Sequence, residues 1–286
     1  MEKQINITYY LHSGFSCEID SNLFIFDYWL GENEELPIDC QLTIPKLKKY
    51  KNIYVLITHS HPDHFDQVVY SWYPELPITY IVSYEMPIGT RGKRLSPGDI
   101  LKISDQIQIK AYTSTDLGVA YLLQYEDLKI FHAGDLNYWH WSEESTPNEI
   151  NEAERAFQSA VAEIVNEKID IAFFPVDPRQ GKMFDAGANY FIMTVKPQLM
   201  IPMHFWKRSE IVTEFARRCR TRETEIIALT NPGDMALIKI MDHHYMTVNI
   251  QLNSSINKKG NRSSEIALTD FEGNDPFIDS DLPVEF

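Results

Sequence analysis

The sequence predicts an α/β protein, of the mixed α+β kind, in which two β-sheets pack face to face and helices cover their outer faces. Residues 5–132 are mainly short β-rich segments, whereas residues 149–220 alternate between helical and strand patterns. Two halves that each pass from strands to helices bury their apolar faces when the sheets stack between the helices. No internal repeat is evident, so we expect one domain over residues 1–252 and a polar, acidic tail over residues 253–286.

The first half of the chain is predicted to be a succession of strands. Residues 5–11 and 16–26 alternate as two antiparallel strands that turn through His12-Ser13-Gly14, and residues 53–58 form the next strand. Turn signals such as Pro97-Gly98-Asp99 separate the segments that follow. We expect these later strands at residues 78–82, 100–103, 107–112, 118–124 and 129–132.

The second half combines helices with strands. Residues 149–167 place Phe157, Ala160 and Val161 along one face, which is the spacing of an amphipathic helix. From residue 253 onward Asn, Ser, Asp, Glu and Lys dominate, as in a linker or a surface loop. Further helices are expected at residues 186–194 and 210–220, and further strands at 169–176, 199–203, 226–229 and 235–240.

The composition is that of a folded globular protein. A chain of 286 residues with 44% hydrophobic content has ample material for a core. No segment approaches the roughly 18 consecutive apolar residues of a membrane span, and the first residues lead into no secretory hydrophobic region. The three cysteines are far apart and odd in number, which indicates neither a disulfide framework nor a thiolate zinc cluster. We therefore expect a soluble, cytoplasmic protein in a reducing compartment.

The charge balance argues against a polynucleotide partner. Lys and Arg total 26 against 41 Asp and Glu, so the formal net charge of −15 repels a phosphate backbone unless basic residues cluster. The two candidate clusters read more simply as solvated surface. They are Lys46, Lys48, Lys49 and Lys51, and Arg217, Arg218, Arg220 and Arg222. We expect a small-molecule partner rather than nucleic acid or a membrane, and the sequence leaves room for a homo-oligomer.

The run Thr58-His59-Ser60-His61-Pro62-Asp63-His64 follows an apolar strand and carries the chemistry of the chain. Three imidazoles and a carboxylate within six residues are hard to explain as packing, although a polar turn with chance histidines is the alternative. Because alternate side chains share a direction, His59 and His61 can hold one metal ion while Asp63 and His64 face a second. That arrangement suits metal-assisted hydrolysis.

Two later positions complete the pattern. Asp135 in Gly134-Asp135 and His204 each lie just past an apolar strand, where functional residues gather at the rim of a sheet. Together with the run at 58–64, their order and the strands before them resemble the metallo-β-lactamase superfamily over residues 5–240. The segments Tyr10-Leu11-His12-Ser13-Gly14-Phe15, Phe26-Asp27 and Lys196-Pro197 before His204 are similar to the narrower branch typified by L-ascorbate-6-phosphate lactonase.

The resemblance implies a four-layer αββα sandwich, a centre of one or two metal ions and a metal-activated water. It implies that His59 and His61 bind the first ion, that Asp63, His64 and His204 bind the second, and that Asp135 bridges them. The expected ion is Zn²⁺, with Mn²⁺ or Fe²⁺ as alternatives.

The sequence departs from the family at the first metal position. Many members supply a third histidine shortly before a glycine, but residues 112–118 contain none. Either Asp116 replaces it, which would shift the preference toward Mn²⁺ or Fe²⁺, or His59, His61 and Asp135 act alone. Asp116 also reads as a turn residue before Gly118 or as an acceptor that orients His59 or His61.

Asp63 is the expected catalytic residue. A bound Zn²⁺-class ion lowers the pKa of water from about 15.7 to about 7, so hydroxide forms near neutral pH. A carboxylate at position 63 can orient that hydroxide, pass its proton on, or protonate the leaving group.

Several neighbours have two readings. His12 lines the pocket or is a hydrogen-bonded turn residue. His132 supports Asp135 from behind or ligates the metal, and the same two interpretations apply to Asp27. Trp139 and Trp206 form an apolar pocket wall or cover a sheet edge. Arg179 supplies positive charge for a substrate phosphate or carboxylate, or is a surface residue.

These residues favour a metal-dependent hydrolase that attacks an ester, lactone or phosphodiester bond in a small, anionic molecule. A nuclease or cyclic-nucleotide phosphodiesterase is an alternative within the same chemistry. The other alternative is a non-enzymatic metal-binding or ligand-sensing protein whose first metal site has degenerated.

Overall fold

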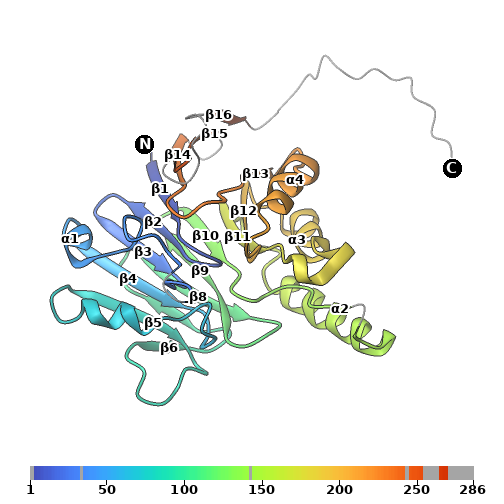
Figure 1. The fold of residues 1–286 in the computed structure, drawn as a ribbon, viewed down its shortest axis with the longest axis horizontal. Coiled ribbons are helices and arrows are strands. Elements are labelled where there is room, and N and C mark those ends of the chain that lie inside the picture. Colours follow the sequence, from blue (N-terminus) through green and yellow to red (C-terminus); the bar gives the residue numbers. More distant parts are fainter. Residues whose placement is uncertain (1–2, 33–34, 142–143, 242–244, 254–263, 270–286) are drawn as a thin grey trace.

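The structure is a computed structural model that describes residues 3–32, 35–141, 144–241, 245–253 and 264–269. Two β-sheets face each other, and helices lie outside them (Figure 1). The mixed α/β sandwich predicted from the sequence is therefore confirmed.

The first sheet has nine strands in the order β16-β15-β14-β1-β2-β3-β4-β5-β6. Strands β3 to β6 run parallel to one another, and the remaining neighbours pair antiparallel. The bounds are β1 Lys3–Tyr9, β2 Phe15–Ile19, β3 Asn22–Phe26, β4 Asn52–Ile57, β5 Ile78–Ser83, β6 Lys93–Leu95, β14 Met235–Met241, β15 Tyr245–Gln251 and β16 Ser264–Thr269.

The second sheet has seven strands in the order β13-β12-β11-β10-β9-β8-β7. Strands β10 to β13 are parallel, whereas β7 to β10 form antiparallel hairpins. The bounds are β7 Ile100–Lys102, β8 Ile107–Thr113, β9 Val119–Tyr125, β10 Leu128–His132, β11 Ile171–Pro175, β12 Leu199–Met203 and β13 Glu225–Ile226.

The main core lies between the two sheets. Phe15 on β2 stacks on Phe173 of β11 with ring centroids 4.3 Å apart, and both side chains are fully buried. Burying an aromatic side chain of this kind stabilises the fold by about 1.5–3 kcal/mol. The facing sheets are therefore joined by apolar contacts close to the rim at which the predicted metal ligands end.

The helical layers differ in thickness. Helices α2 (Pro147–Ala162), α3 (Ala186–Val195) and α4 (Ser209–Cys219) lie on the side of the seven-stranded sheet (Figure 1). Among the described helical segments, only the single turn α1 (Ile44–Leu47) and the 3₁₀ segment η1 (Gln67–Trp72) add residues to the second apolar cluster, over the other sheet. A further 3₁₀ segment, η2 (Pro178–Met183), follows β11. None of the described helices is long and apolar enough to cross a membrane.

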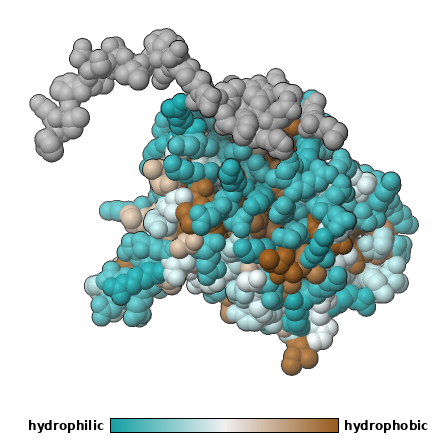
Figure 2. Space-filling model, turned by 180° about the vertical axis from the view of Figure 1, so that it is seen from behind, coloured by the Kyte–Doolittle hydropathy of each residue, from teal (hydrophilic) through white to brown (hydrophobic). Residues whose placement is uncertain are grey.

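The helix predicted at residues 149–167 begins at Pro147 and ends at Ala162. Thr146 and Glu149 form a capping box at its start, which fixes the first turn. The surface seen from behind is mostly hydrophilic with scattered hydrophobic residues (Figure 2).

Three sequence expectations about strands need correction. Residues 16–26 form a hairpin of β2 and β3 rather than one strand, because the chain turns at Asp20, which has a left-handed φ of 54°. Aspartate tolerates this conformation, and the segment contains no glycine or proline that would have indicated a turn. The strand expected at 226–229 is shortened to Glu225–Ile226. Strands β6 and β15 were not predicted, and β16, which lies in the predicted tail, pairs with β15. The other tail residues, 254–263 and 270–286, lie outside the described residues.

Candidate metal centre

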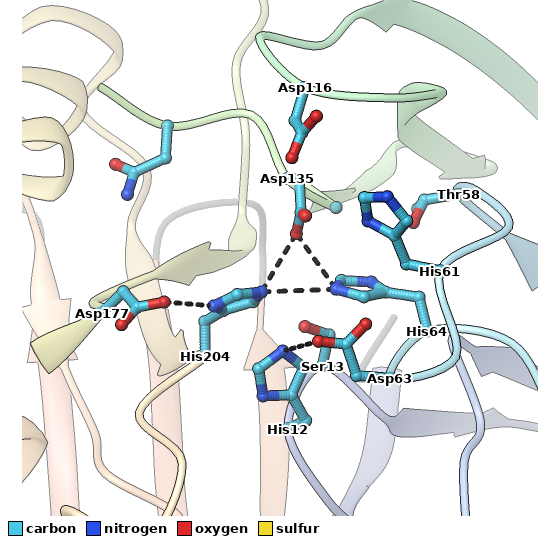
Figure 3. Close-up of polar contacts among 12 residues, drawn as sticks. His12, Ser13, Thr58, His61, Asp63, His64, Asp116, Asp135, Asp177 and His204 are labelled. Atoms are coloured by element: carbon cyan, nitrogen blue, oxygen red, sulfur yellow. Dashed lines mark hydrogen bonds and ion pairs between the residues drawn. The ribbon is translucent and has the colours of Figure 1, made fainter. Parts of the chain in front are cut away.

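The predicted ligands come from loops at one end of the sandwich. The run at 58–64 follows β4, Asp135 follows β10, and His204 follows β12. Asp135 and His204 converge because the carboxyl ends of the parallel strands β10 and β12 meet at the same edge of the seven-stranded sheet. The facing nine-stranded sheet brings the end of β4 to the same rim. The close-up in Figure 3 shows them gathered around the Asp135 carboxylate.

The second metal position is built on Asp135, His64 and His204. Asp135 Oδ1 lies 3.0 Å from His64 Nε2 and 3.1 Å from His204 Nε2, and the two Nε2 atoms are 3.3 Å apart (Figure 3). Metal–nitrogen bonds of about 2.0–2.1 Å in a tetrahedral site separate ligand atoms by roughly 3.3 Å. The spacing of these three atoms therefore fits one tetrahedral ion.

The side chains also lack the partners that buried polar groups need. Asp135 Oδ1 and both ring nitrogens of His12 are buried, and within the described residues none of them completes a hydrogen bond of good geometry. Leaving such a group unsatisfied costs about 1–3 kcal/mol, so native sites supply a partner. Donor atoms aimed at one another at these distances fit a metal ion between them.

Asp63 and His12 lie beside this position. Their donor atoms, with those of His64 and His204, all lie within 4.8 Å of one another. His12 Nε2 is 3.4 Å from Asp63 Oδ2, and the His12 ring packs on His204 with centroids 3.8 Å apart. His12 sits in a turn with φ of 54°, and its ring enters the site, as the pocket interpretation expects. The interpretation as a hydrogen-bonded turn residue is not supported, because neither ring nitrogen completes a hydrogen bond within the described residues.

The first metal position contains His59, His61 and the second oxygen of Asp135. His59 Nε2 lies 3.1 Å from His61 Nδ1 and 3.4 Å from Asp135 Oδ2. Asp116 joins this position, since its carboxylate, His61 and Asp135 place donor atoms within 4.8 Å of one another. Asp116 also has the turn role, because its Oδ1 accepts a hydrogen bond from the Leu117 amide at 2.9 Å.

Asp27 orients His64 from behind. The fully buried Asp27 accepts hydrogen bonds from the Thr58 amide at 2.8 Å and the Thr58 hydroxyl at 2.6 Å, and lies 2.8 Å from His64 Nδ1. A proton on Nδ1 leaves the Nε2 lone pair facing Asp135, which is the tautomer that a metal ligand needs. The supporting role expected for Asp27 is therefore to orient the His64 ring through Nδ1.

Asp177 orients His204 in the same way and was missed from the sequence. Its Oδ2 lies 2.8 Å from His204 Nδ1, and the carboxylate is fully buried. The available signal was its position directly after the apolar run of β11, which matches the position of Asp135 after β10. Two carboxylate–histidine pairs therefore fix two imidazoles that face the same point.

The electrostatics of the two positions differ, because the surroundings of His59 favour its neutral form, whereas the carboxylates beside His64 favour a positive charge. Burial and the neighbouring His64 lower the pKa of His59 to about 3. Burial alone would raise the pKa of Asp177, but hydrogen bonds from His204 and Arg179 lower it to about 2. Burial alone would lower the pKa of His64, yet the Asp135 and Asp27 carboxylates raise it well above its usual value. The centre thus favours a positive charge between Asp135 and His64, as a proton or a metal ion supplies.

His132 acts on the backbone before Asp135 rather than on its carboxylate. His132 Nε2 lies 2.9 Å from the Ser13 carbonyl oxygen, and Nδ1 accepts a hydrogen bond from the Gly134 amide at 3.2 Å. The ring is buried and stacks on Phe26 with centroids 5.1 Å apart. It therefore links the β1–β2 turn to the turn that presents Asp135.

The metal positions open into a cavity of about 340 Å³. Trp139 is anchored by a hydrogen bond from its indole Nε1 to the Asp135 carbonyl oxygen at 2.8 Å. Trp206 stands behind Arg179, whose guanidinium carbon is 4.8 Å from the Trp206 ring centroid. The residues that line the cavity are His61, Asp63, Thr115, Asp116, Asp135, Trp139, Trp141, Arg179 and His204.

The two facing sheets with a histidine and aspartate centre at one rim define the metallo-β-lactamase fold. The metallo-β-lactamase fold protein YhfI from Bacillus subtilis is 11% identical, covers 82% of this chain and 99% of its own, and has a TM-score of 0.52. Igni18, a metallo hydrolase from Ignicoccus hospitalis, is 17% identical over 83% of this chain and 99% of its own, with a TM-score of 0.60.

A curated relative extends the likeness to sequence. The chain is 22% identical over 248 residues to a UPF0173 metal-dependent hydrolase from Pyrobaculum islandicum, which covers 80% of this chain and 98% of the relative. No family model matches the chain.

Proposed function

We propose that this protein is a metal-dependent hydrolase that uses a metal-activated water to cleave an ester, lactone or phosphodiester bond in a small, anionic molecule. The observation that carries the proposal is the triangle of Asp135 Oδ1, His64 Nε2 and His204 Nε2, with sides of 3.0, 3.1 and 3.3 Å. The relative from Pyrobaculum islandicum, named a metal-dependent hydrolase, supports the same activity.

The proposed ligand sets are drawn from three overlapping clusters of donor atoms, in which His64 and Asp135 each belong to two clusters. His59, His61, Asp116 and one oxygen of Asp135 would hold the first ion, and Asp63, His64, His204 and the other Asp135 oxygen the second. When bound, Zn²⁺-class ions supply a hydroxide at neutral pH and polarise a carbonyl or phosphoryl oxygen. Each proposed position offers two imidazole nitrogens and two carboxylate oxygens, a donor set that suits Zn²⁺ and also Mn²⁺ or Fe²⁺.

Asp63 is the proposed proton carrier. Its side chain is 25% exposed and lines the cavity, in contrast to the fully buried Asp27. A carboxylate that reaches both the metal position and the cavity can accept a proton from the nucleophilic water and deliver one to the leaving group.

The cavity supports a small substrate. Its volume of about 340 Å³ lies at the lower end of the roughly 300–1,000 Å³ range of small-molecule sites. The net charge of −15 opposes a polynucleotide. The motifs shared with the L-ascorbate-6-phosphate lactonase branch make a phosphorylated lactone one of the compounds to test.

Reconstitution with defined metals tests the proposal. Protein loaded separately with Zn²⁺, Mn²⁺ and Fe²⁺ should hydrolyse at least one member of a panel of lactones, thioesters, phosphodiesters and small cyclic nucleotides. Asp63→Asn should lower kcat by two orders of magnitude or more while KM changes little. Absence of turnover with every metal would overturn the proposal in favour of a metal-binding or ligand-sensing protein.

A further inference from the structure

Arg179 is the one Lys or Arg side chain among the described residues that line the cavity. Asp63, Asp116 and Asp135 line the same space. Two divalent ions would outweigh the charge of these three carboxylates, and Arg179, whose own charge is balanced by Asp177, adds N–H donors. A metal-loaded cavity with this balance attracts an anion.

Asp177 holds one edge of the Arg179 guanidinium. Arg179 Nε donates to Asp177 Oδ1 at 3.0 Å and Oδ2 at 2.9 Å, and Nη2 donates to Oδ2 at 2.6 Å. The planar guanidinium has five N–H donors, so the edge that carries Nη1 remains for another acceptor. The side chain is 48% exposed, and no hydrogen bond to Nη1 is found within the described part of the chain. Arg179 is thus fixed in place with a donor pair unused.

Aromatic rings fix the plane of the same group. The guanidinium carbon lies 4.8 Å from the Trp206 ring centroid and 5.7 Å from that of Trp141. Contacts of this kind stabilise the guanidinium and limit its rotation. A cation that is oriented before its ligand arrives binds with a smaller loss of conformational entropy.

Next to the cation lies an apolar wall. Trp139 and Trp141 stack with centroids 6.0 Å apart and an interplanar angle of 14°, and both line the cavity. Trp139 also lies 5.5 Å from the His204 ring, so the wall reaches from Arg179 to the metal position. A planar or apolar group on the wall would sit between the anion site and the proposed ions.

We propose that the free edge of Arg179 binds an oxyanion, either a carboxylate or a phosphate, on a small substrate whose apolar part rests on Trp139 and Trp141. The placement of the scissile bond at Asp135 rests on the proposed hydrolase function, whereas binding of the oxyanion does not. The substrate class is therefore a small anionic compound with a planar or apolar portion between its charge and the bond that is cleaved.

Equilibrium binding to the full-length, metal-loaded protein tests this inference without turnover. The probes are phenylacetate, its neutral counterpart phenylacetamide, and phenylphosphonate, titrated by calorimetry and by tryptophan fluorescence. Loss of a charge-assisted, two-point contact corresponds to roughly 10–100-fold in Kd. Arg179→Met should weaken binding of one or both anions by this factor and leave phenylacetamide within about twofold. A larger loss of affinity for phenylacetate would identify a carboxylate site, and a larger loss for phenylphosphonate would identify a phosphate site.

Arg208→Met is the matched control, because Arg208 is exposed, pairs with Glu210 and does not line the cavity. It should bind all three probes as the wild type does. Equal anion binding by Arg179→Met and wild type, at equal metal content, would overturn the inference. If Arg179→Met does not fold, Arg179→Lys takes its place, since lysine keeps the charge and loses the fork. Arg179→Lys should weaken anion binding at least several-fold, and unchanged binding would overturn the inference.

The two proposals can fail separately. Arg179-dependent anion binding without turnover by any metal form would contradict the hydrolase and leave the anion site standing. Turnover by the wild type, together with anion binding that is unchanged in Arg179→Met, would contradict the anion site and support the hydrolase.

Discussion

Replacing Asp27 with asparagine should weaken metal binding at His64 even though every proposed ligand is still present. Asp27 Oδ2 accepts from the Thr58 hydroxyl and lies 2.8 Å from His64 Nδ1, while Oδ1 accepts from the Thr58 amide. An amide has one acceptor oxygen, so its NH₂ must face a donor on one side. If the NH₂ faces His64, Nδ1 becomes the acceptor and the ring proton moves to Nε2, which then cannot bind metal.

The magnitude follows from these contacts. Loss of an outer carboxylate that orients a ligand histidine typically lowers metal affinity by about 10–100-fold. The mismatched buried donor should also destabilise the fold by about 2–4 kcal/mol. Competition with a chromogenic chelator gives the metal affinity, and urea denaturation of chelator-treated protein gives the free energy of unfolding.

Asp234→Asn is the matched control for this change. Asp234 is equally buried and accepts hydrogen bonds from the amides of Thr230, Asn231 and Asn253, but it makes no hydrogen bond to a proposed ligand. It should lose stability and keep its metal affinity. An Asp27→Asn protein that binds metal within twofold of the wild type would refute the tautomer argument.

Three further changes test other parts of the structure. Asp116→Ala should weaken the first metal position at least tenfold in a two-site titration, and unchanged affinity and stoichiometry would assign Asp116 to the turn alone. Gly118→Ala should cost about 2–4 kcal/mol in urea denaturation, because at φ of 78° its Cβ would overlap Thr58 O and lie 2.6 Å from the His59 Cβ. Gly98→Ala, with φ of 90° and open space, should cost only about 1 kcal/mol. Glu167→Gln should remove about 1 kcal/mol at pH 7. Burial alone would raise the pKa of Glu167, but hydrogen bonds from Lys129 and Tyr112 lower it, so the stabilisation is present above the ordinary Glu pKa and is lost on acidification. The difference from wild type should therefore shrink as the pH falls below the ordinary Glu pKa of about 4.3 and vanish below the lowered pKa of Glu167, and a constant difference would contradict it.

The parts of the fold that were predicted depend on local signals. Strand β12 coincides with the predicted residues 199–203, because an apolar run ends there at His204. The hairpin at Asp20 left no such signal, since a non-glycine residue takes the left-handed conformation. Strand β16 contains the apolar residues Ile266, Ala267 and Leu268, but the segment around it is polar, and it is recognised only by its pairing with β15.

The candidate site shows the same division. The run at 58–64 lies within one loop, so its metal-binding residues could be predicted from the sequence. The contacts of His12 with Asp63 and of Asp177 with His204 join loops from different strands, and no local pattern encodes such distances. His12, Asp27, His204 and Trp206 also adopt positive φ values, which tertiary packing imposes against their intrinsic preference.

Metal content of the reconstituted Asp135→Ala protein tests the shared carboxylate most directly. Asp135 offers Oδ1 to His64 and His204 and Oδ2 to His59, so it belongs to both metal positions. After removal of excess metal by gel filtration, elemental analysis should find about two ions per wild-type chain. The variant, folded by circular dichroism, should retain none at stoichiometric occupancy. Wild-type metal content in Asp135→Ala would contradict a centre built around this residue.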